Sequence, residues 1–216
     1  MNKKGLFDVI SPIMVGPSSS HTAGAIRLGI MARNIFNDTI TKVDFCLYNS
    51  FAQTGKGHGT DKGLLAGVMG LSVDDIRIRN IFENTNLKYS FTYKEDLSRH
   101  PNSVDIKIND KMTISGESVG AGEIEISSIN GFSVKLKGVY DIILLMYKDE
   151  IGMISKISKI IQDHKLNIAS LQCDRSQKGG NASMCVALDS EPKNNIIEEI
   201  KEIKDVYFAT KIKRLN

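Results

Sequence analysis

Residues 141–147 read Asp-Ile-Ile-Leu-Leu-Met-Tyr, an apolar run that opens on a single charged residue. An apolar run without alternation is typical of a strand that is buried on both faces. The other elements expected nearby are amphipathic helices over 152–163 and 194–204 and strands over 167–173, 182–188 and 206–212. The resulting order, β-α-β-β-α-β within residues 138–216, is that of a ferredoxin-like unit.

The part of the chain before this unit indicates an α/β domain. A serine-rich turn over 18–22 runs into a helical pattern that extends to Arg33, and residues 42–48 alternate like a strand. A glycine-rich loop at 54–59 precedes a short helix, and residues 76–130 are mostly strand-like. The turns expected in that last region are Asn109-Asp110 and Gly120–Gly122. We therefore expect an α/β domain over 1–135 and a ferredoxin-like domain over 138–216, with the boundary at 131–137.

Composition excludes several classes of protein. The chain has 216 residues, of which 41% are hydrophobic and 25% charged, so it can form two small globular domains. Its 28 basic and 25 acidic side chains are interspersed and leave a net charge of +3. A nucleic-acid-binding protein normally carries a larger, clustered excess of positive charge, so no nucleic-acid partner is expected.

Cysteine usage indicates a reducing compartment. Cys46, Cys173 and Cys185 are far apart, and no two form a C-x-x-C motif, so neither a disulfide framework nor a local zinc or iron–sulfur ligand set is expected. Asp8 interrupts the N-terminal apolar residues, which argues against a secretory signal. No apolar run approaches the length of a membrane span. We expect a cytoplasmic protein that does not contact membranes and has no metal site of its own.

Three of the four histidines occupy unusual contexts. His21 lies among hydroxyl side chains at the expected helix start, His58 lies between two glycines, and His100 precedes a proline. Imidazole transfers protons near neutral pH, which suits a lyase that removes an α-proton. For each histidine alone, an ordinary exposed side chain is the alternative. His164, near the end of an expected helix, is interpreted as structural.

The serine-rich helix start also suits an anion. Backbone N–H groups and hydroxyls converge there, so a carboxylate or a phosphate would bind; the alternative is that one serine simply caps the helix. The loop Gly55–Gly59 has neither the P-loop spacing nor the G-x-G-x-x-G fingerprint. The residues alone indicate an anion-binding α/β domain followed by a small domain of regulatory type.

The same segments resemble the beta subunit of iron–sulfur-dependent L-serine dehydratases. The resemblance rests on Gly16–Gly24, which contains Ser-Ser-Ser-His-Thr, on Asn49–Asp61, which contains Gly-Lys-Gly-His-Gly-Thr-Asp, and on His100–Asn102. The C-terminal region resembles an ACT domain, in which Asp149–Gly152 matches the usual D-x-x-G turn, with Ile151 where a proline is common.

The resemblance implies an activity, a cofactor and a partner. The family converts L-serine to pyruvate and ammonia with a [4Fe-4S] cluster and without pyridoxal phosphate. In the two-subunit form, the cluster cysteines belong to the alpha subunit, and an iron atom acts as Lewis acid on the substrate. The partners implied are therefore an alpha subunit and L-serine, and ACT domains also form oligomers by joining their sheets.

The resemblance also implies roles for individual residues. His58, His21 and His100 correspond to histidines that reach a shared active site, and His58 is favoured for proton transfer because its glycine neighbours allow close approach. The residues expected to bind substrate or order the histidines are Ser18, Ser19, Ser20, Thr22, Asn49, Ser50, Lys56 and Asp61.

Two alternatives remain open at this point. The family's first domain is related to an allosteric substrate-binding domain of some 3-phosphoglycerate dehydrogenases, so the serine-rich loop is either catalytic or allosteric. The ACT domain would take a regulatory ligand near Asp149, Gly152 and Asn167. A non-catalytic amino-acid sensor is therefore the alternative function.

Overall fold

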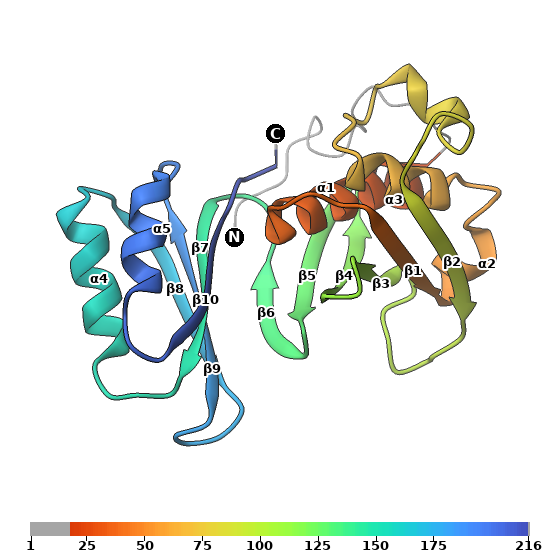
Figure 1. The fold of residues 1–216 in the computed structure, drawn as a ribbon. Helices are drawn as coiled ribbons and strands as arrows, with labels where there is room; N and C mark the ends of the chain where they lie inside the picture. Colours follow the sequence, from red (N-terminus) through yellow and green to blue (C-terminus); the bar gives the residue numbers. More distant parts are fainter. Residues whose placement is uncertain (1–17, 216) are drawn as a thin grey trace. The chain divides into compact units, whose positions relative to one another are not determined.

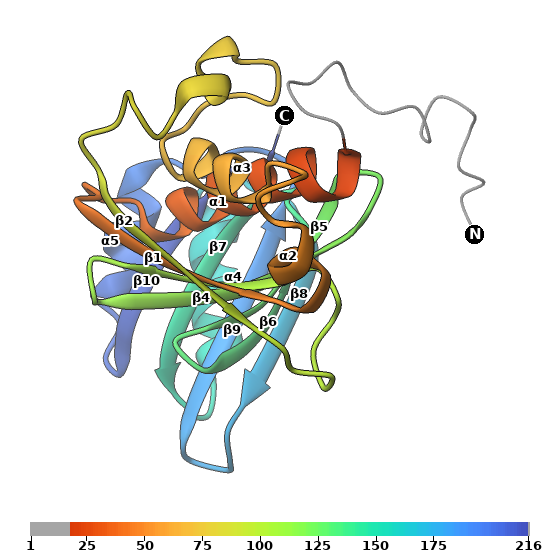
Figure 2. The ribbon, with the colours of Figure 1, turned by 90° about the vertical axis from the view of Figure 1, so that its right-hand side faces the viewer.

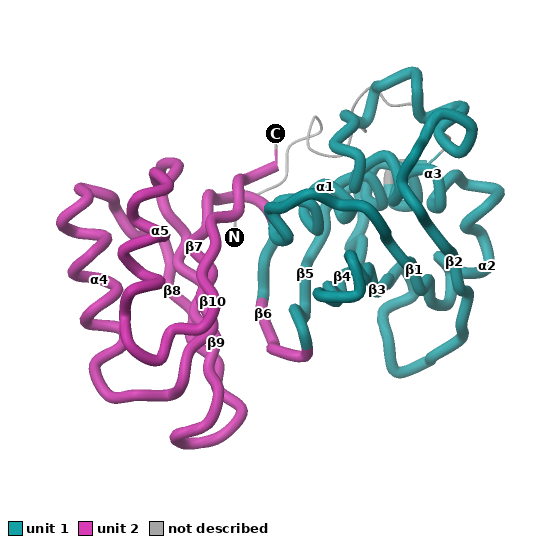
Figure 3. The backbone as a smooth tube through the Cα atoms, in the orientation of Figure 1, with its two compact units in different colours: residues 1–130, 135–137 teal, residues 131–134, 138–216 magenta. Residues whose placement is uncertain are grey.

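A computed structural model describes residues 18–215 of the chain, except for the side chain of Ser19. Gly16 and Pro17, which open the first motif, and the expected start of the first domain lie outside the described residues. The chain divides into two compact units, Met1–Asn130 with Lys135–Lys137 and Gly131–Val134 with Gly138–Asn216 (Figure 3).

The first unit is built on a six-stranded sheet with the order β2-β1-β3-β4-β5-β6, although residues 132–134 of the last strand group with the second unit. Its strands are β1 (Lys42–Tyr48), β2 (Lys88–Lys94), β3 (Ser103–Ile108), β4 (Met112–Gly120), β5 (Glu123–Ile129) and β6 (Phe132–Leu136). Strands β1 and β2 pair in parallel, whereas the pairs β1–β3, β3–β4 and β4–β5 are antiparallel. The segments that follow β1 and β2 therefore leave the sheet at the same edge.

The helices of this unit pack against each other through glycines. They are α1 (Gly24–Phe36), α2 (Asn49–Thr54) and α3 (Thr60–Val68), with a π-helical turn η2 (Ser19–Ala23) and a 3₁₀ turn η3 (Ile76–Asn80). Figure 2 shows α1 and α3 on the same side of the sheet. A Cβ atom on Gly67 of α3 would lie 2.1 Å from the carbonyl oxygen of Ile26 in α1, so the two backbones touch.

A core of large apolar side chains joins these helices to the sheet. Leu28 and Met31 of α1, Leu64 of α3, and Phe45 of β1 are each at most 1% exposed. On β4, Gly116 lets α1 approach, because a Cβ there would lie 2.9 Å from a methyl group of Leu28. Among residues 18–215, no helix combines the length and the apolar character that crossing a membrane requires.

The second unit has the order β-α-β-β-α-β and a four-stranded sheet, β10-β7-β9-β8. Its elements are β7 (Asp141–Lys148), α4 (Met153–Asp163), β8 (Ile168–Arg175), β9 (Asn181–Leu188), α5 (Asn194–Lys201) and β10 (Val206–Ile212). Figure 1 shows both helices on one face of the sheet. Ile143 and Met184 of the sheet, Ile157 of α4 and Ile196 of α5 belong to the core between the layers. The run at 141–147 forms β7, one of the two inner strands of this sheet.

The predicted fold class is confirmed, and the structure adds elements that local patterns did not indicate. The strands at 42–48 and 206–212 lie where the sequence predicts them. The expected turn at Asn109-Asp110 is present, and both residues have left-handed φ angles of 50° and 57°. Residues 76–130 are mostly strand, as expected, but they begin with a 3₁₀ turn at Ile76–Asn80. Helix α2 was not expected, because a helix of six residues is too short to show periodicity.

Candidate active site

The serine-rich motif fixes His21 between two hydroxyl groups. Ser18 precedes the π-helical turn, and its Oγ accepts a hydrogen bond of 3.2 Å from the backbone N–H of His21, which is the geometry of an N-cap. The same Oγ lies 3.2 Å from Nδ1 of His21, and Ser50 Oγ on α2 lies 3.2 Å from Nε2. Both ring nitrogens therefore have a hydroxyl partner, which sets the orientation of the imidazole. π-Helical turns of this kind are frequent at functional sites.

His58 lies opposite His21 on the turn between α2 and α3. The turn relies on Gly59, whose φ of 70° is left-handed and suits glycine. The buried Thr22 holds the turn in place, because its hydroxyl donates a hydrogen bond of 2.8 Å to the carbonyl oxygen of His58. The His58 side chain is exposed, and its ring meets the ring of His21 edge-on, with the ring centroids 5.0 Å apart.

His100 approaches the same region from the segment after β2. Its side chain is exposed, and no described contact joins it to His21 or His58. The connection runs through Phe51, whose backbone N–H donates a hydrogen bond of 3.2 Å to the carbonyl oxygen of Pro101. The Phe51 ring in turn lies 5.6 Å from the His21 ring. The structure thus pairs His21 with His58 and places the segment of His100 next to that pair.

The pKa of His21 is lowered from 6.5 by burial and, to a smaller extent, by the charge of His58. Burial disfavours the charged imidazolium, and a second positive charge nearby adds to that effect. The neutral ring therefore predominates at neutral pH.

Replacing His58 with glutamine is expected to raise the pKa of His21, because one of the two causes of its depression is removed. The pKa should remain below 6.5, since the burial of His21 persists. An NMR titration that follows the imidazole Cε1–H signals measures the change. His164→Gln in the second unit is the matched control and should leave His21 unaffected. A His21 pKa that is the same with and without His58 would show that the two rings do not interact.

The other residues expected to bind substrate lie in different environments. Ser20 is half-buried in the π-helical turn, and Lys56 is exposed before His58. Asp61 is only 7% exposed at the start of α3, and burial raises the pKa of its carboxyl, against the opposing effects of Lys62 and Lys56. Asn49 has a φ of 49°, and its side-chain amide binds the backbone of the segment after β2.

Two polar features of the site were not predicted. Asp105 on β3 accepts hydrogen bonds from Tyr48, Arg99 and Ser115. Alternation along β3 indicates only that Asp105 faces away from the core, and its partners are too distant in sequence to give a local signal. The second feature is Oδ1 of Asn102, which is buried and has no hydrogen-bond partner among the described residues.

Comparison with known proteins identifies the family. The family model described as "Serine dehydratase beta chain" matches residues 5–89. The chain is 34% identical over 218 residues to the probable L-serine dehydratase beta chain of Bacillus subtilis (strain 168), covering 98% of this chain and 99% of that relative. It is 38% identical over 197 residues to the L-serine dehydratase beta chain of Peptoniphilus asaccharolyticus, covering 88% of this chain and 89% of that relative. This chain belongs to the serine dehydratase beta-chain family.

The second unit of this beta-chain family member is an ACT domain. A second family model, described as "AHAS small subunit-like ACT domain", matches residues 143–208. A further similarity, 23% identity over 152 residues, is to the D-3-phosphoglycerate dehydrogenase of Bacillus subtilis (strain 168), and it covers 67% of this chain and 29% of that relative. The predicted resemblance to serine dehydratase beta subunits with an ACT domain is confirmed.

The ACT domain of this beta chain has a pocket of about 300 Å³ at one end of its sheet. Asp149 and Gly152 line it together with Cys173 and Arg175. Asp149 Oδ2 accepts hydrogen bonds of 3.0 Å from Arg175 and from the backbone N–H of Gly179, which lower the pKa of its carboxyl. Asn167 lies at the other end of the sheet, because it precedes Ile168, and Ile168 pairs with Leu188 in the register of β8 and β9. The structure therefore brings together two of the three expected regulatory residues.

The described residues of this beta chain do not fit an iron–sulfur cluster. Cys46 is half-buried on β1, whereas Cys185 is buried on β9 and Cys173 is exposed on β8. Within residues 18–215, no three His, Cys, Asp or Glu side chains gather in a way that would hold a metal ion. A cluster needs several thiolates from one site, and the described residues do not supply them.

Proposed function

We propose that this chain is the beta subunit of an L-serine ammonia-lyase and that it completes an active site on an alpha subunit that holds the [4Fe-4S] cluster. The observation that carries the proposal is the imidazole pair His21–His58. Hydroxyl groups orient His21 from both sides, and His58 is exposed on a glycine-flanked turn in a member of the serine dehydratase beta-chain family.

His58 is the proposed base that removes the α-proton of L-serine. Its exposed ring projects from a turn whose backbone is fixed by Thr22, so it can approach a substrate held by another subunit. The base becomes positively charged when it accepts the proton. Because the pKa of the neighbouring His21 is depressed, His21 remains neutral and does not repel that charge.

The remaining polar groups are proposed to bind and orient the substrate. The exposed ammonium group of Lys56 and the hydroxyl groups of Ser18, Ser19 and Ser20 suit the carboxylate of L-serine. Oδ1 of Asn102, which has no hydrogen-bond partner among residues 18–215, suits the substrate's ammonium group, because that group needs an acceptor. His100, two residues earlier, is the proposed third histidine of the site.

The overall reaction balances without an added oxidant or reductant. L-Serine loses its α-proton and its hydroxyl group, which together make one water molecule, and aminoacrylate remains. Aminoacrylate tautomerises to the imine, and one water molecule hydrolyses the imine to pyruvate and ammonia.

Reconstitution tests this proposal. The purified chain alone is expected to form no pyruvate from L-serine, whereas an anaerobic mixture with a cluster-loaded alpha subunit should form it. Turnover by the alpha subunit alone at the rate of the mixture would contradict the proposal, and so would turnover by this chain without its partner.

The ACT pocket is the proposed site of a regulatory amino acid. Separately, β8 is an edge strand of the ACT sheet and is the proposed site at which two such sheets join. The pocket combines carboxylates with Arg175, which suits a small zwitterion. Calorimetric titration of the full chain with L-serine tests the ligand. Micromolar binding of L-serine that disappears in Asp149→Ala supports this role. If the chain binds L-serine and the complex still turns it over normally without His21 and His58, the non-catalytic sensor is favoured instead.

A further inference from the structure

A hydrogen-bonded cluster lies on the face of the first sheet that points away from α1. Gly116 faces α1, because a Cβ there would meet Leu28. Ser115, the preceding residue on β4, therefore faces the opposite side, and it pairs in register with Asp105 on β3. Asp105 pairs in turn with Cys46 on β1, two residues before Tyr48. Side chains from three strands thus meet on this face, outside the imidazole pair.

Asp105 is the centre of this cluster. Its carboxylate accepts hydrogen bonds from both terminal nitrogens of Arg99 at 3.0 and 2.8 Å, from the hydroxyl of Tyr48 at 2.8 Å and from the hydroxyl of Ser115 at 2.7 Å. Burial raises the pKa of Asp105, but the hydrogen bonds from Arg99, Ser115 and Tyr48 outweigh burial and hold its pKa below the ordinary value. The Arg99 guanidinium also lies 4.0 Å from the centre of the Tyr48 ring.

The geometry of this cluster restricts each member. The Arg99 and Asp105 side chains are only 27% and 23% exposed, and a paired guanidinium–carboxylate contact has a defined orientation. A lysine in place of Arg99 would keep the charge but lose the paired hydrogen bonds and the planar contact with Tyr48. The cluster therefore fixes the position of Arg99 more tightly than an exposed ion pair would.

The backbone next to Arg99 is held as well. The Asn49 side-chain nitrogen donates hydrogen bonds to the carbonyl oxygens of Asp96 and Arg99, and its Oδ1 accepts one of 2.8 Å from the Asp96 N–H. Tyr48 is the last residue of β1, and Asn49 follows it as the first residue of α2. The segment 96–99 is thus bound through its backbone by Asn49 and through its last side chain by Tyr48 and Asp105.

Both ends of this cluster adjoin groups of the candidate site. His100 directly follows Arg99 in the chain. Ser50 directly follows Asn49, and its hydroxyl contacts Nε2 of His21. The cluster therefore connects the segment of His100 to the first turn of α2 that supplies the hydroxyl partner of His21.

We propose that Asp105, together with Arg99 and Tyr48, acts as a positioning residue for the reaction: it fixes the place of His100 relative to the Ser50–His21 pair without touching the substrate. This inference rests on the proposed function. It assigns a role to Tyr48, Arg99 and Asp105, which lie outside the family motifs.

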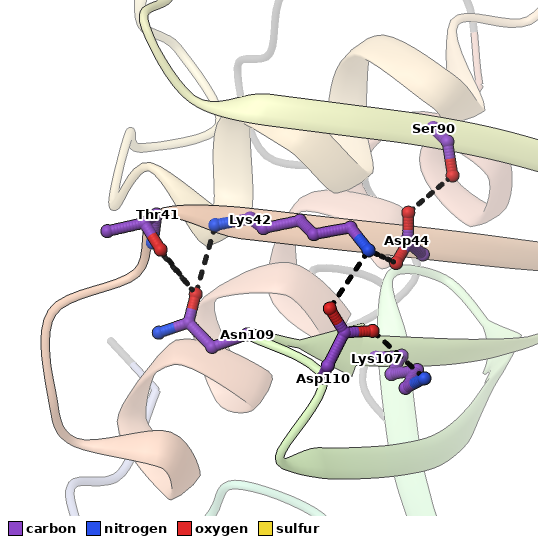
Figure 4. Close-up of polar contacts among 7 residues, drawn as sticks. All are labelled: Thr41, Lys42, Asp44, Ser90, Lys107, Asn109 and Asp110. Carbon is purple, nitrogen blue, oxygen red and sulfur yellow. Dashed lines mark hydrogen bonds and ion pairs between the residues drawn. The ribbon is translucent and has the colours of Figure 1, made fainter.

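A second polar cluster in the same sheet offers a matched control. Asp110, in the turn after β3, forms ion pairs of 3.0 Å with Lys42 and Lys107, and Lys42 also contacts Asp44 at 3.1 Å (Figure 4). This cluster lies at the other end of β1 and β3, because Val43 pairs with Ile108. Its side chains are about half exposed, and exposed ion pairs contribute little to stability. Asp110→Asn thus removes a carboxylate from the same sheet without approaching the histidines.

The test compares Asp105→Asn, Arg99→Lys and Tyr48→Phe with Asp110→Asn. The first readout is amide hydrogen exchange of residues 95–102 in the full chain alone. We expect exchange there to accelerate by about tenfold or more in Asp105→Asn and Arg99→Lys, to a smaller extent in Tyr48→Phe, and not at all in Asp110→Asn.

The second readout is steady-state kinetics of the complex with the alpha subunit. A misplaced catalytic group lowers kcat more than it weakens binding, so kcat for L-serine should fall by about tenfold to a hundredfold in Asp105→Asn and Arg99→Lys. KM should rise by a smaller factor than kcat falls, because the loosened segment also carries Asn102, the proposed acceptor for the substrate ammonium. A kcat within about twofold of the unaltered complex, or an equal loss in Asp110→Asn, would overturn the proposal.

The two readouts separate this inference from the proposed function. A complex of the unaltered chain that fails to turn over L-serine overturns the proposed function. The exchange measurement does not depend on turnover. If amide exchange of residues 95–102 is unchanged in all three variants, Asp105 does not hold this segment in place. That conclusion is independent of the activity of the complex.

Discussion

Replacing His58 with alanine is expected to lower kcat for L-serine in the reconstituted complex by about a hundredfold to ten-thousandfold. This is the range that removal of a general base produces, because the α-proton then has only water to accept it. KM should change much less, since His58 is not one of the groups that bind the carboxylate or the ammonium. The measurement is steady-state pyruvate formation under anaerobic conditions.

The fold of the turn should survive this substitution. The contacts that hold residue 58 involve its backbone: its N–H donates to the carbonyl oxygen of Thr54, and its carbonyl oxygen accepts from Thr22. His164→Ala is the matched control, because His164 contacts Glu199 in the ACT domain and has no place in the proposed chemistry. If the His58→Ala complex has a kcat close to that of the His164→Ala complex, His58 is not the base. His21 and His100 are then the remaining candidates.

Replacing Gly67 with alanine is expected to destabilise the first unit by about 3 kcal/mol or more. The added methyl group would lie 2.1 Å from the carbonyl oxygen of Ile26 and 2.8 Å from the Cα of Gly29, and both are backbone atoms that no side-chain rotation can move away. Helices α1 and α3 would have to separate, and His21 and His58 precede these two helices. The imidazole pair should therefore loosen as well.

Urea unfolding followed by circular dichroism measures this loss, and the transition of the ACT domain serves as an internal reference. Gly57→Ala is the matched control, because the nearest atom to its added Cβ is 3.8 Å away. An unfolding free energy of Gly67→Ala equal to that of Gly57→Ala would show that α1 and α3 do not touch through their backbones.

The sequence predicts the ACT domain well because each of its elements has a local signal. The continuous apolar run of β7 indicates a buried strand, and the isoleucines at helical spacing in α4 and α5 indicate amphipathic helices. Both patterns can be recognised without knowing the fold. The strand over 206–212 lies where alternation places it. In the first unit, the same reasoning locates β1 but not its parallel partner, because pairing across a long connection leaves no pattern in either strand.

The residues of the candidate site could be predicted from the sequence, but the contacts between them could not. Residue context singles out His21 and His58, yet their contact depends on a crossing of α1 and α3 that only the glycines of both helices permit. Thr22 and Asn49 were expected to bind substrate or to order the histidines, and their observed contacts are with the backbone of His58 and of the segment 96–99. Asp105 was predicted only as a strand residue. Its hydrogen bonds come from Tyr48 and Arg99, which reach it through tertiary structure and leave no local signal in the sequence.

Local unfolding should affect the histidine site unevenly, because β2 is an edge strand. β2 pairs only with β1 in the described sheet order, and most of its side chains are exposed. Edge elements with few buried contacts open at a lower free energy than the core of a domain. Opening of β2 would remove the support on one side of the segment that carries His100, which would then depend on its contacts with Asn49 and Asp105. Meanwhile β1, α2 and α3 would keep His21 and His58 together. The candidate site therefore combines a half supported by the inner strand β1 and its helices with a half that is more exposed to local opening at the edge of the sheet.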